Sequence, residues 1–74
     1  MSTKVYTKGV RSTMPQRYAM AIFTSSGEEL FRVNYWKNDK AEEAADMSIA
    51  SWLKANPKYE YSEELAWQAW NNAG

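Results

Sequence analysis

Hydrophobic and polar positions alternate in two neighbouring stretches of the chain, residues 17–24 and 28–36. Successive side chains of a strand point to opposite sides, so this alternation predicts two strands with two distinct faces each. In the first strand, the alternation separates Tyr18, Met20 and Ile22 from Ala19, Ala21 and Phe23. In the second, it separates Phe31, Val33 and Tyr35 from Leu30, Arg32, Asn34 and Trp36. Ser25-Ser26-Gly27 lies between the strands and predicts a hairpin loop with Gly27 in a left-handed conformation.

The hydrophobic period changes from strand-like to helical after residue 38. Apolar residues then recur on one side of a predicted helix over residues 39–55: Ala41, Ala45, Ile49, Trp52 and Leu53. Asp39 is the expected N-cap, and Glu42 three residues later completes a capping-box pattern. The dipeptide Asn56-Pro57 predicts the end of this helix, because the residue before a proline disfavours helical backbone.

The flanking segments predict shorter elements. Residues 1–16 contain a possible strand over residues 5–11 and then a connection in which Pro15 opposes a central strand. Residues 58–61 alternate and are expected to be extended, and Ser62 should cap a short helix over residues 62–72. The chain is therefore expected to be one small α+β domain over residues 1–74. We expect a small antiparallel sheet of two or three strands, packed on the main helix and followed by a short C-terminal helix.

Composition narrows the chemistry. A chain of 74 residues buries only about 60% of the surface that its unfolded form exposes, so its aromatic rings must supply much of the core. The chain has no cysteine and no histidine, which excludes disulfides, thiolate nucleophiles, histidine general bases and zinc sites built from these residues. Glu42 and Asp46 share one helix face and could hold Mg²⁺ or act as acid and base, but an ordinary solvated face is the favoured interpretation. We expect no enzymatic activity, no metal and no cofactor.

Charge is unevenly distributed although the formal net charge is zero. Residues 1–40 contain seven basic and three acidic side chains, and residues 41–74 contain two basic and six acidic ones. Salt screens charges that lie more than about 8–10 Å apart. A partner that touches the sheet would therefore meet its local positive charge and feel little of the acidic residues elsewhere. The polar start of the sequence predicts no signal peptide, and no apolar run approaches the roughly 18 residues of a membrane span. The expected location is the cytoplasm, with no membrane partner.

Several short motifs occur in the order found in one family. The segments Gly9-Val10-Arg11 and Arg17-Tyr18-Ala19, followed by Ile22, precede a helix that contains Glu42-Glu43-Ala44-Ala45. Over residues 6–50 this pattern resembles the AP2/ERF-type DNA-binding domain, which implies three strands, one helix and DNA binding through the exposed sheet face. The resemblance implies basic contact positions at Lys8, Arg11 and Arg17. Ala21 and Phe23 stand where the family has a glutamate and an arginine, and Pro15 stands where it has a tryptophan.

The basic and aromatic positions of the predicted sheet form the candidate binding site. The candidates on or beside the sheet are Lys8, Arg11, Arg17, Phe23, Arg32 and Trp36, and Trp67 of the short helix is added as a further candidate. Tryptophan and arginine dominate protein interfaces, so Trp67 is either a partner anchor or a cover for the core, whereas Trp70 is expected to cover the core.

The first hypothesis is a non-enzymatic module that binds another protein, a host or regulatory target, as a monomer or homodimer. In style the chain looks like the small inhibitor or regulator proteins of bacteriophages. The alternative is an AP2-like DNA-binding protein that uses the same sheet face.

Overall fold

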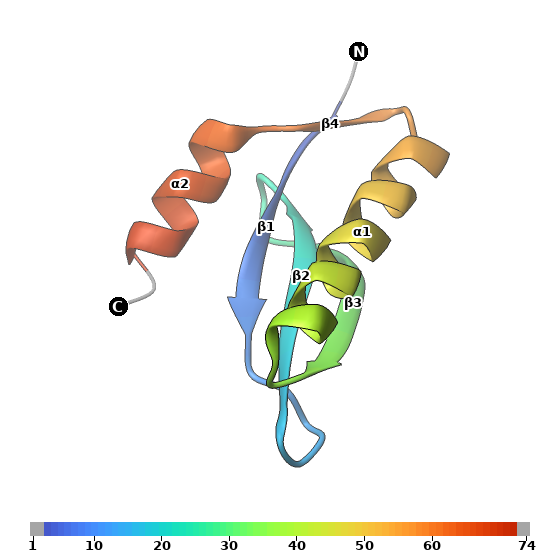
Figure 1. Ribbon diagram of the computed structural model, residues 1–74. Helices are drawn as coiled ribbons and strands as arrows, with labels where there is room; N and C mark the ends of the chain where they lie inside the picture. The colour runs from blue at the N-terminus through green and yellow to red at the C-terminus, as the bar shows by residue number, and fades with distance from the viewer. Residues whose placement is uncertain (1–2, 73–74) are drawn as a thin grey trace.

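The computed structural model describes residues 3–72, which form strands and helices in the order βββαβα (Figure 1). The elements are β1 (Thr3–Val10), β2 (Arg17–Thr24), β3 (Glu29–Trp36), α1 (Asp39–Ala55), β4 (Tyr59–Tyr61) and α2 (Glu63–Asn72). The predicted α+β class is confirmed, and so is the short helix that follows the main one. The possible first strand is a true strand that spans Thr3–Val10 instead of residues 5–11.

The sheet has four strands in the order β3-β2-β1-β4 within the described residues. The prediction of a two- to three-stranded antiparallel sheet was therefore wrong. Strands β1, β2 and β3 are antiparallel to their neighbours, but β4 pairs in parallel with β1, matching Thr3 with Tyr59 and Val5 with Tyr61. The chain reaches this position because α1 carries it from one edge of the sheet to the other, as a parallel connection requires.

The β2–β3 hairpin turns where the sequence predicts. Gly27 has a φ of 96°, and its amide donates to the Thr24 carbonyl at 2.9 Å. A β-bulge follows, because Phe23 is matched with Glu29 while Ile22 is matched with Phe31. The extra residue is Leu30, which packs against the core together with Phe31. Leu30 was expected on the opposite face, and the bulge breaks the strict alternation on which that expectation depended.

Helix α1 begins at Asp39, but its N-cap is Asn38. The side-chain Oδ1 of Asn38 accepts a 2.8 Å hydrogen bond from the Ala41 amide. The predicted capping box from Asp39 to Glu42 is therefore wrong. Both acids lie instead in the first turn, where the helix dipole favours negative charge. At the other end, the Asn56 amide donates to the Leu53 carbonyl at 3.2 Å and closes the helix.

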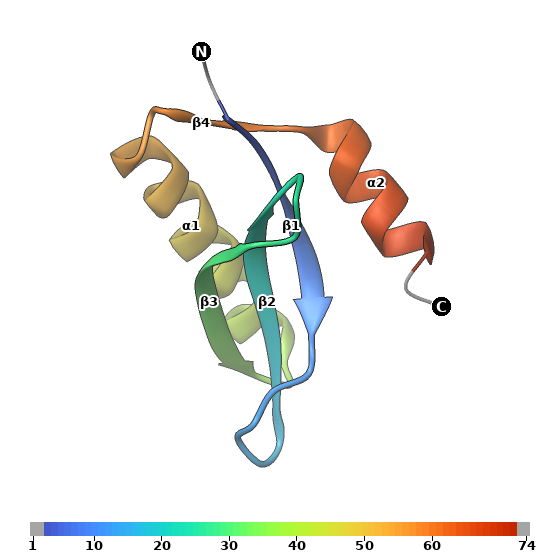
Figure 2. The ribbon, with the colours of Figure 1, turned by 180° about the vertical axis from the view of Figure 1, so that it is seen from behind.

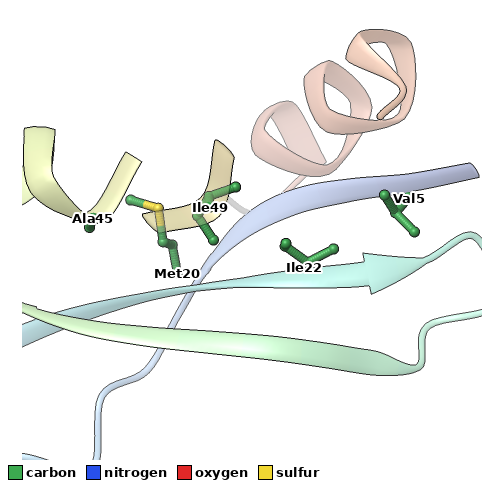
Figure 3. Close-up of a cluster of buried hydrophobic side chains, with 5 residues drawn as sticks. All are labelled: Val5, Met20, Ile22, Ala45 and Ile49. Carbon is green, nitrogen blue, oxygen red and sulfur yellow. The ribbon is translucent and has the colours of Figure 1, made fainter. Parts of the chain in front are cut away.

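The hydrophobic core lies between the sheet and α1. Val5, Met20 and Ile22 of the strands form one buried cluster with Ala45 and Ile49 of the helix (Figure 3). Trp52 extends this core, because its ring stacks on Phe31 at 5.8 Å and on Tyr59 at 5.3 Å. The core thus uses side chains of every strand together with α1.

Helix α2 packs beside β1, on the same side of the sheet as α1 (Figure 3). The Ser62 amide donates to the Val5 carbonyl at 2.8 Å, and its hydroxyl accepts from the Leu65 amide at 3.2 Å, which confirms the predicted cap. A view from behind shows the sheet in front of α1, so one sheet face carries no helix of the described residues (Figure 2). Neither described helix has the length and apolar character that crossing a membrane would require.

Candidate functional site

The sheet face turned away from the helices, here called the open face, carries most of the candidate side chains. Strand alternation and register place seven basic and aromatic residues on it: Lys4, Tyr6, Lys8, Arg17, Phe23, Arg32 and Trp36. They come from all three antiparallel strands. A sheet that is packed on one side and bare on the other normally presents polar groups there, so the tryptophan and the phenylalanine stand out.

Arg17 and Trp36 form the most defined contact of the open face. They are cross-strand partners, and the guanidinium carbon of Arg17 lies 3.6 Å from the centre of the Trp36 ring. Arg17 also donates to the Pro15 carbonyl at 3.4 Å, which limits its freedom. Trp36 remains 53% exposed beneath this stack. A planar cation on an exposed indole is a large, ordered and amphipathic surface.

Arg32 is held in place by two different groups. Its guanidinium donates to the Glu29 carboxylate at 2.8 Å and to the Arg11 carbonyl at 3.2 Å. The charge of Arg32 is therefore partly neutralised on its own strand. The second contact ties the segment after β1 to β3, and it places Arg11 at the margin of the open face.

Aromatic contact continues at the opposite end of the open face. Tyr6 and Phe23 are cross-strand partners whose ring centres lie 5.8 Å apart in a stacked arrangement. Tyr6 is absent from the sequence-based candidates, although the alternation of β1 places it on the same side as Lys8. Applying the same two-residue period to β1 that was applied to β2 and β3 would have found it.

Two small residues of β2 lie at the centre of the open face. Ala19 and Ala21 of β2 are 2% and 0% exposed, although no described helix covers them. Lys8 and Arg32 are matched with Ala21 from either side, and such long side chains can lie over small neighbours while keeping their charges in water. The open face thus presents cationic and aromatic groups above two buried alanines.

Trp67 does not join this face. It lies on α2, on the other side of the sheet, and is 68% exposed. The structure therefore brings together Lys8, Arg17, Phe23, Arg32 and Trp36, places Arg11 beside them, and separates Trp67 from them. Trp70, which was expected to cover the core, is 53% exposed, but its ring lies over Gly9 of β1.

A cleft of about 290 Å³ opens between the two helices on their side of the sheet. Tyr18 and Tyr35 line it from the sheet, Glu42 from α1 and Trp70 from α2. Burial raises the pKa of the Tyr35 hydroxyl above its ordinary value, and the nearby carboxylates of Glu42 and Asp46 raise it further. Sequence reasoning missed this cleft because it depends on where α2 docks.

A second groove, of about 250 Å³, lies between α1 and β3 at the edge of the sheet. Its helix wall consists of small residues, Ala41, Ala44, Ala45 and Ser48, and its sheet wall is residues 33–36. Strand β3 is the outermost strand on this side, so it has only one described strand as a neighbour.

Acidic side chains are dispersed over the described part of the chain. Within residues 3–72 no group of three or more aspartate or glutamate side chains is placed to hold a metal ion. Glu42 and Asp46 lie one helical turn apart on α1, and both carboxylates contribute to raising the pKa of the Tyr35 hydroxyl.

The AP2/ERF resemblance stays a prediction, because an order of strands and helices does not show a family. Comparison of the chain with protein-family models, with curated proteins and with solved structures gives no match.

Proposed function

We propose that this chain is a non-enzymatic binding module whose open face docks on an acidic surface of another protein. The observation that carries the proposal is the Arg17–Trp36 stack, an exposed indole covered by a guanidinium 3.6 Å away. Tryptophan and arginine are the residue types that contribute most binding energy at protein interfaces. A small regulator or inhibitor would act in this way by occupying its target's surface.

The ordered state of the two arginines supports a protein partner. Arg17 is fixed by Trp36 and the Pro15 carbonyl, and Arg32 is fixed by Glu29 and the Arg11 carbonyl. Side chains that are already ordered lose less conformational entropy on binding, so they favour a rigid and matching surface. A partner would meet the cationic and aromatic side chains of the open face, because Ala19 and Ala21 beneath them are buried.

Capture experiments test the proposal by comparing a variant of the open face with a variant on the other side of the sheet. Immobilised wild-type protein, an Arg17→Ala/Trp36→Ala variant and a Trp67→Ala variant are exposed to the same cell lysate. We expect at least one protein to be retained by wild type and Trp67→Ala but lost with the open-face variant. Identical retention by all three proteins would overturn the proposal, and circular dichroism confirms that each variant is folded.

Nucleic acid is the second candidate, because Lys8 and Arg17 project from neighbouring strands of the same face. Cations that contact phosphates release counterions, so such binding weakens steeply with salt. The test is fluorescence anisotropy with duplex DNA at low and moderate salt. Binding that falls with salt and is lost in Lys8→Ala and Arg17→Ala would replace the protein-partner proposal, whereas no binding at micromolar protein in low salt would exclude this candidate.

A further inference from the structure

Three aromatic rings meet in the cleft between α1 and α2, on the opposite side of the sheet from the open face. Tyr18 and Tyr35 are cross-strand partners with ring centres 5.9 Å apart and planes inclined by 57°. Trp70 reaches the same cleft from α2. The volume of about 290 Å³ is close to the lower end of the roughly 300–1,000 Å³ that small-molecule sites occupy.

Negative charge accompanies these rings. Glu42 lines the cleft, and Asp46 lies one helical turn further along α1, near enough for both carboxylates to act on the Tyr35 hydroxyl. Among the described residues, no lysine or arginine lines the cleft. The cleft is therefore aromatic with the Glu42 carboxylate in its wall, which suits a cation with an apolar surface.

One ring of the cleft already has an ammonium group beside it. The Nζ atom of Lys37 lies 5.0 Å from the centre of the Tyr18 ring, within the roughly 6 Å over which cation–π attraction acts. Lys37 itself is exposed and follows the end of β3. This contact shows that the Tyr18 ring can accept an ammonium group at its face.

Gly9 allows the indole of Trp70 to approach the sheet. A Cβ atom at position 9 would lie 2.8 Å from Cη2 of Trp70 and 3.0 Å from its Cζ3. The missing side chain therefore provides the space in which the ring rests. The packing of the Trp70 ring against Gly9 therefore positions the aromatic side of the cleft.

We propose that this cleft binds an alkylammonium ion, with Tyr18, Tyr35 and Trp70 surrounding the cation and Glu42 supplying the opposite charge. Aromatic faces attract quaternary and alkylated ammonium groups because the ring quadrupole is negative above its plane. The cation is supplied either by a free amine or by the lysine side chain of a protein.

Choline and its uncharged isostere 3,3-dimethyl-1-butanol test this proposal on the intact chain. The readout is the indole N–H signal of Trp70 in nuclear magnetic resonance spectra, assigned by its loss in Trp70→Leu. Choline should shift this signal saturably, and the neutral isostere should bind about tenfold more weakly because it lacks the cation–π and charge attraction. Equal binding of the two compounds, or no saturable shift with choline, would overturn the proposal.

Matched variants separate the cleft from the rest of the surface. Glu42→Gln should weaken choline binding about twofold to fivefold, the range of an exposed charge pair, whereas Glu43→Gln in the same turn should not. Trp70→Leu should weaken binding strongly, observed through Tyr35, whereas Trp67→Leu should not. If Trp70→Leu disturbs the fold, the glutamate pair still decides, and identical affinities for Glu42→Gln and Glu43→Gln would contradict the assignment.

The source of the cation is resolved by comparing n-butylammonium with a short peptide that contains one central lysine. Both carry the same alkylammonium group, so both should shift the Trp70 signal if the proposal is correct. Tighter binding of the peptide assigns a protein ligand, and equal affinity assigns a free amine. Failure of both amines to shift the signal would contradict the proposal, because an alkylammonium site must accept a primary ammonium group as well as choline.

Discussion

The guanidinium carbon of Arg17 lies 3.6 Å from the centre of the Trp36 ring, and the two residues face each other across β2 and β3. One contact thus joins the start of β2 to the end of β3, close to the point where the chain leaves the sheet for α1. The same contact links the two strands of the hairpin and leaves the Trp36 ring 53% exposed.

The stack should be measurable as a pairwise interaction. Arg17→Ala, Trp36→Ala and the double variant form a cycle whose coupling free energy should be about 0.5–1 kcal/mol, the value for a cation over an exposed ring. Urea denaturation of the four proteins gives this value. A coupling free energy of zero would show that the two side chains are close without attracting each other.

Capping of α1 provides a second prediction. Asn38→Ala removes the acceptor of the Ala41 amide and should lower the free energy of unfolding by about 1 kcal/mol. Asp39→Asn keeps the backbone and removes only a charge that favours the helix dipole, so its smaller effect should fade as salt is added. Thermal denaturation at low and high salt distinguishes the two. The reverse order of effects would mean that Asp39 is the cap.

The core should respond strongly to the loss of one buried side chain. Ile22 is 0% exposed and lies in the cluster between the sheet and α1, so Ile22→Ala should cost about 2–5 kcal/mol. A chain of 74 residues has a free energy of unfolding of about 4–11 kcal/mol, so this substitution should remove a large fraction of it. Ile22→Val should cost about 0.5–1.5 kcal/mol. Met47→Ala, at an exposed site, serves as the control in urea denaturation.

Gly9→Ala should change the position of Trp70 more than it changes stability. The new Cβ would collide with the far end of the indole, which is half exposed and can move outward. Alanine also has less backbone freedom to lose than glycine in a strand, which offsets part of the cost. The free energy of unfolding should therefore change by less than about 1 kcal/mol, while the Trp70 indole signal shifts. An unshifted signal would contradict the close approach of ring and strand.

The raised pKa of Tyr35 leads us to expect a lower free energy of unfolding at high pH. Burial, with the carboxylates of Glu42 and Asp46, raises the pKa of its hydroxyl in the folded protein. The unfolded chain releases this proton near pH 10, before the folded protein does, so the free energy of unfolding falls as pH rises above that value. Tyr35→Phe should show a shallower decline between pH 9 and pH 11. Parallel declines for the two proteins would show that Tyr35 is not responsible.

Local patterns in the sequence predicted local structure well. The alternation in residues 17–24 corresponds to β2, and the helical period in residues 39–55 corresponds to α1, because each of these segments buries one continuous face. The same alternation was wrong at Leu30. A bulge inserts one residue into β3, and nothing in the hydrophobic pattern marks where the strand register shifts.

Long-range pairing was harder to predict. Strand β4 has three residues and pairs with β1 from the other end of the chain, so its partner is determined by the path of α1 and not by its own sequence. The candidate site shows the same division. Five candidates on three strands lie on one face as strand alternation implies, whereas the cleft around Trp70 depends on the docking of α2, which no local pattern specifies.

The parallel pairing of β1 with β4 sets an order of events during synthesis. Strand β1 is made first, but its neighbour β4 starts at Tyr59, so one edge of β1 stays bare until most of the chain has left the ribosome. Bare strand edges are templates for pairing with other chains. A product truncated before β4 would therefore leave the outer edge of Thr3–Val5 without a strand partner, and such fragments should aggregate more readily than the full-length chain.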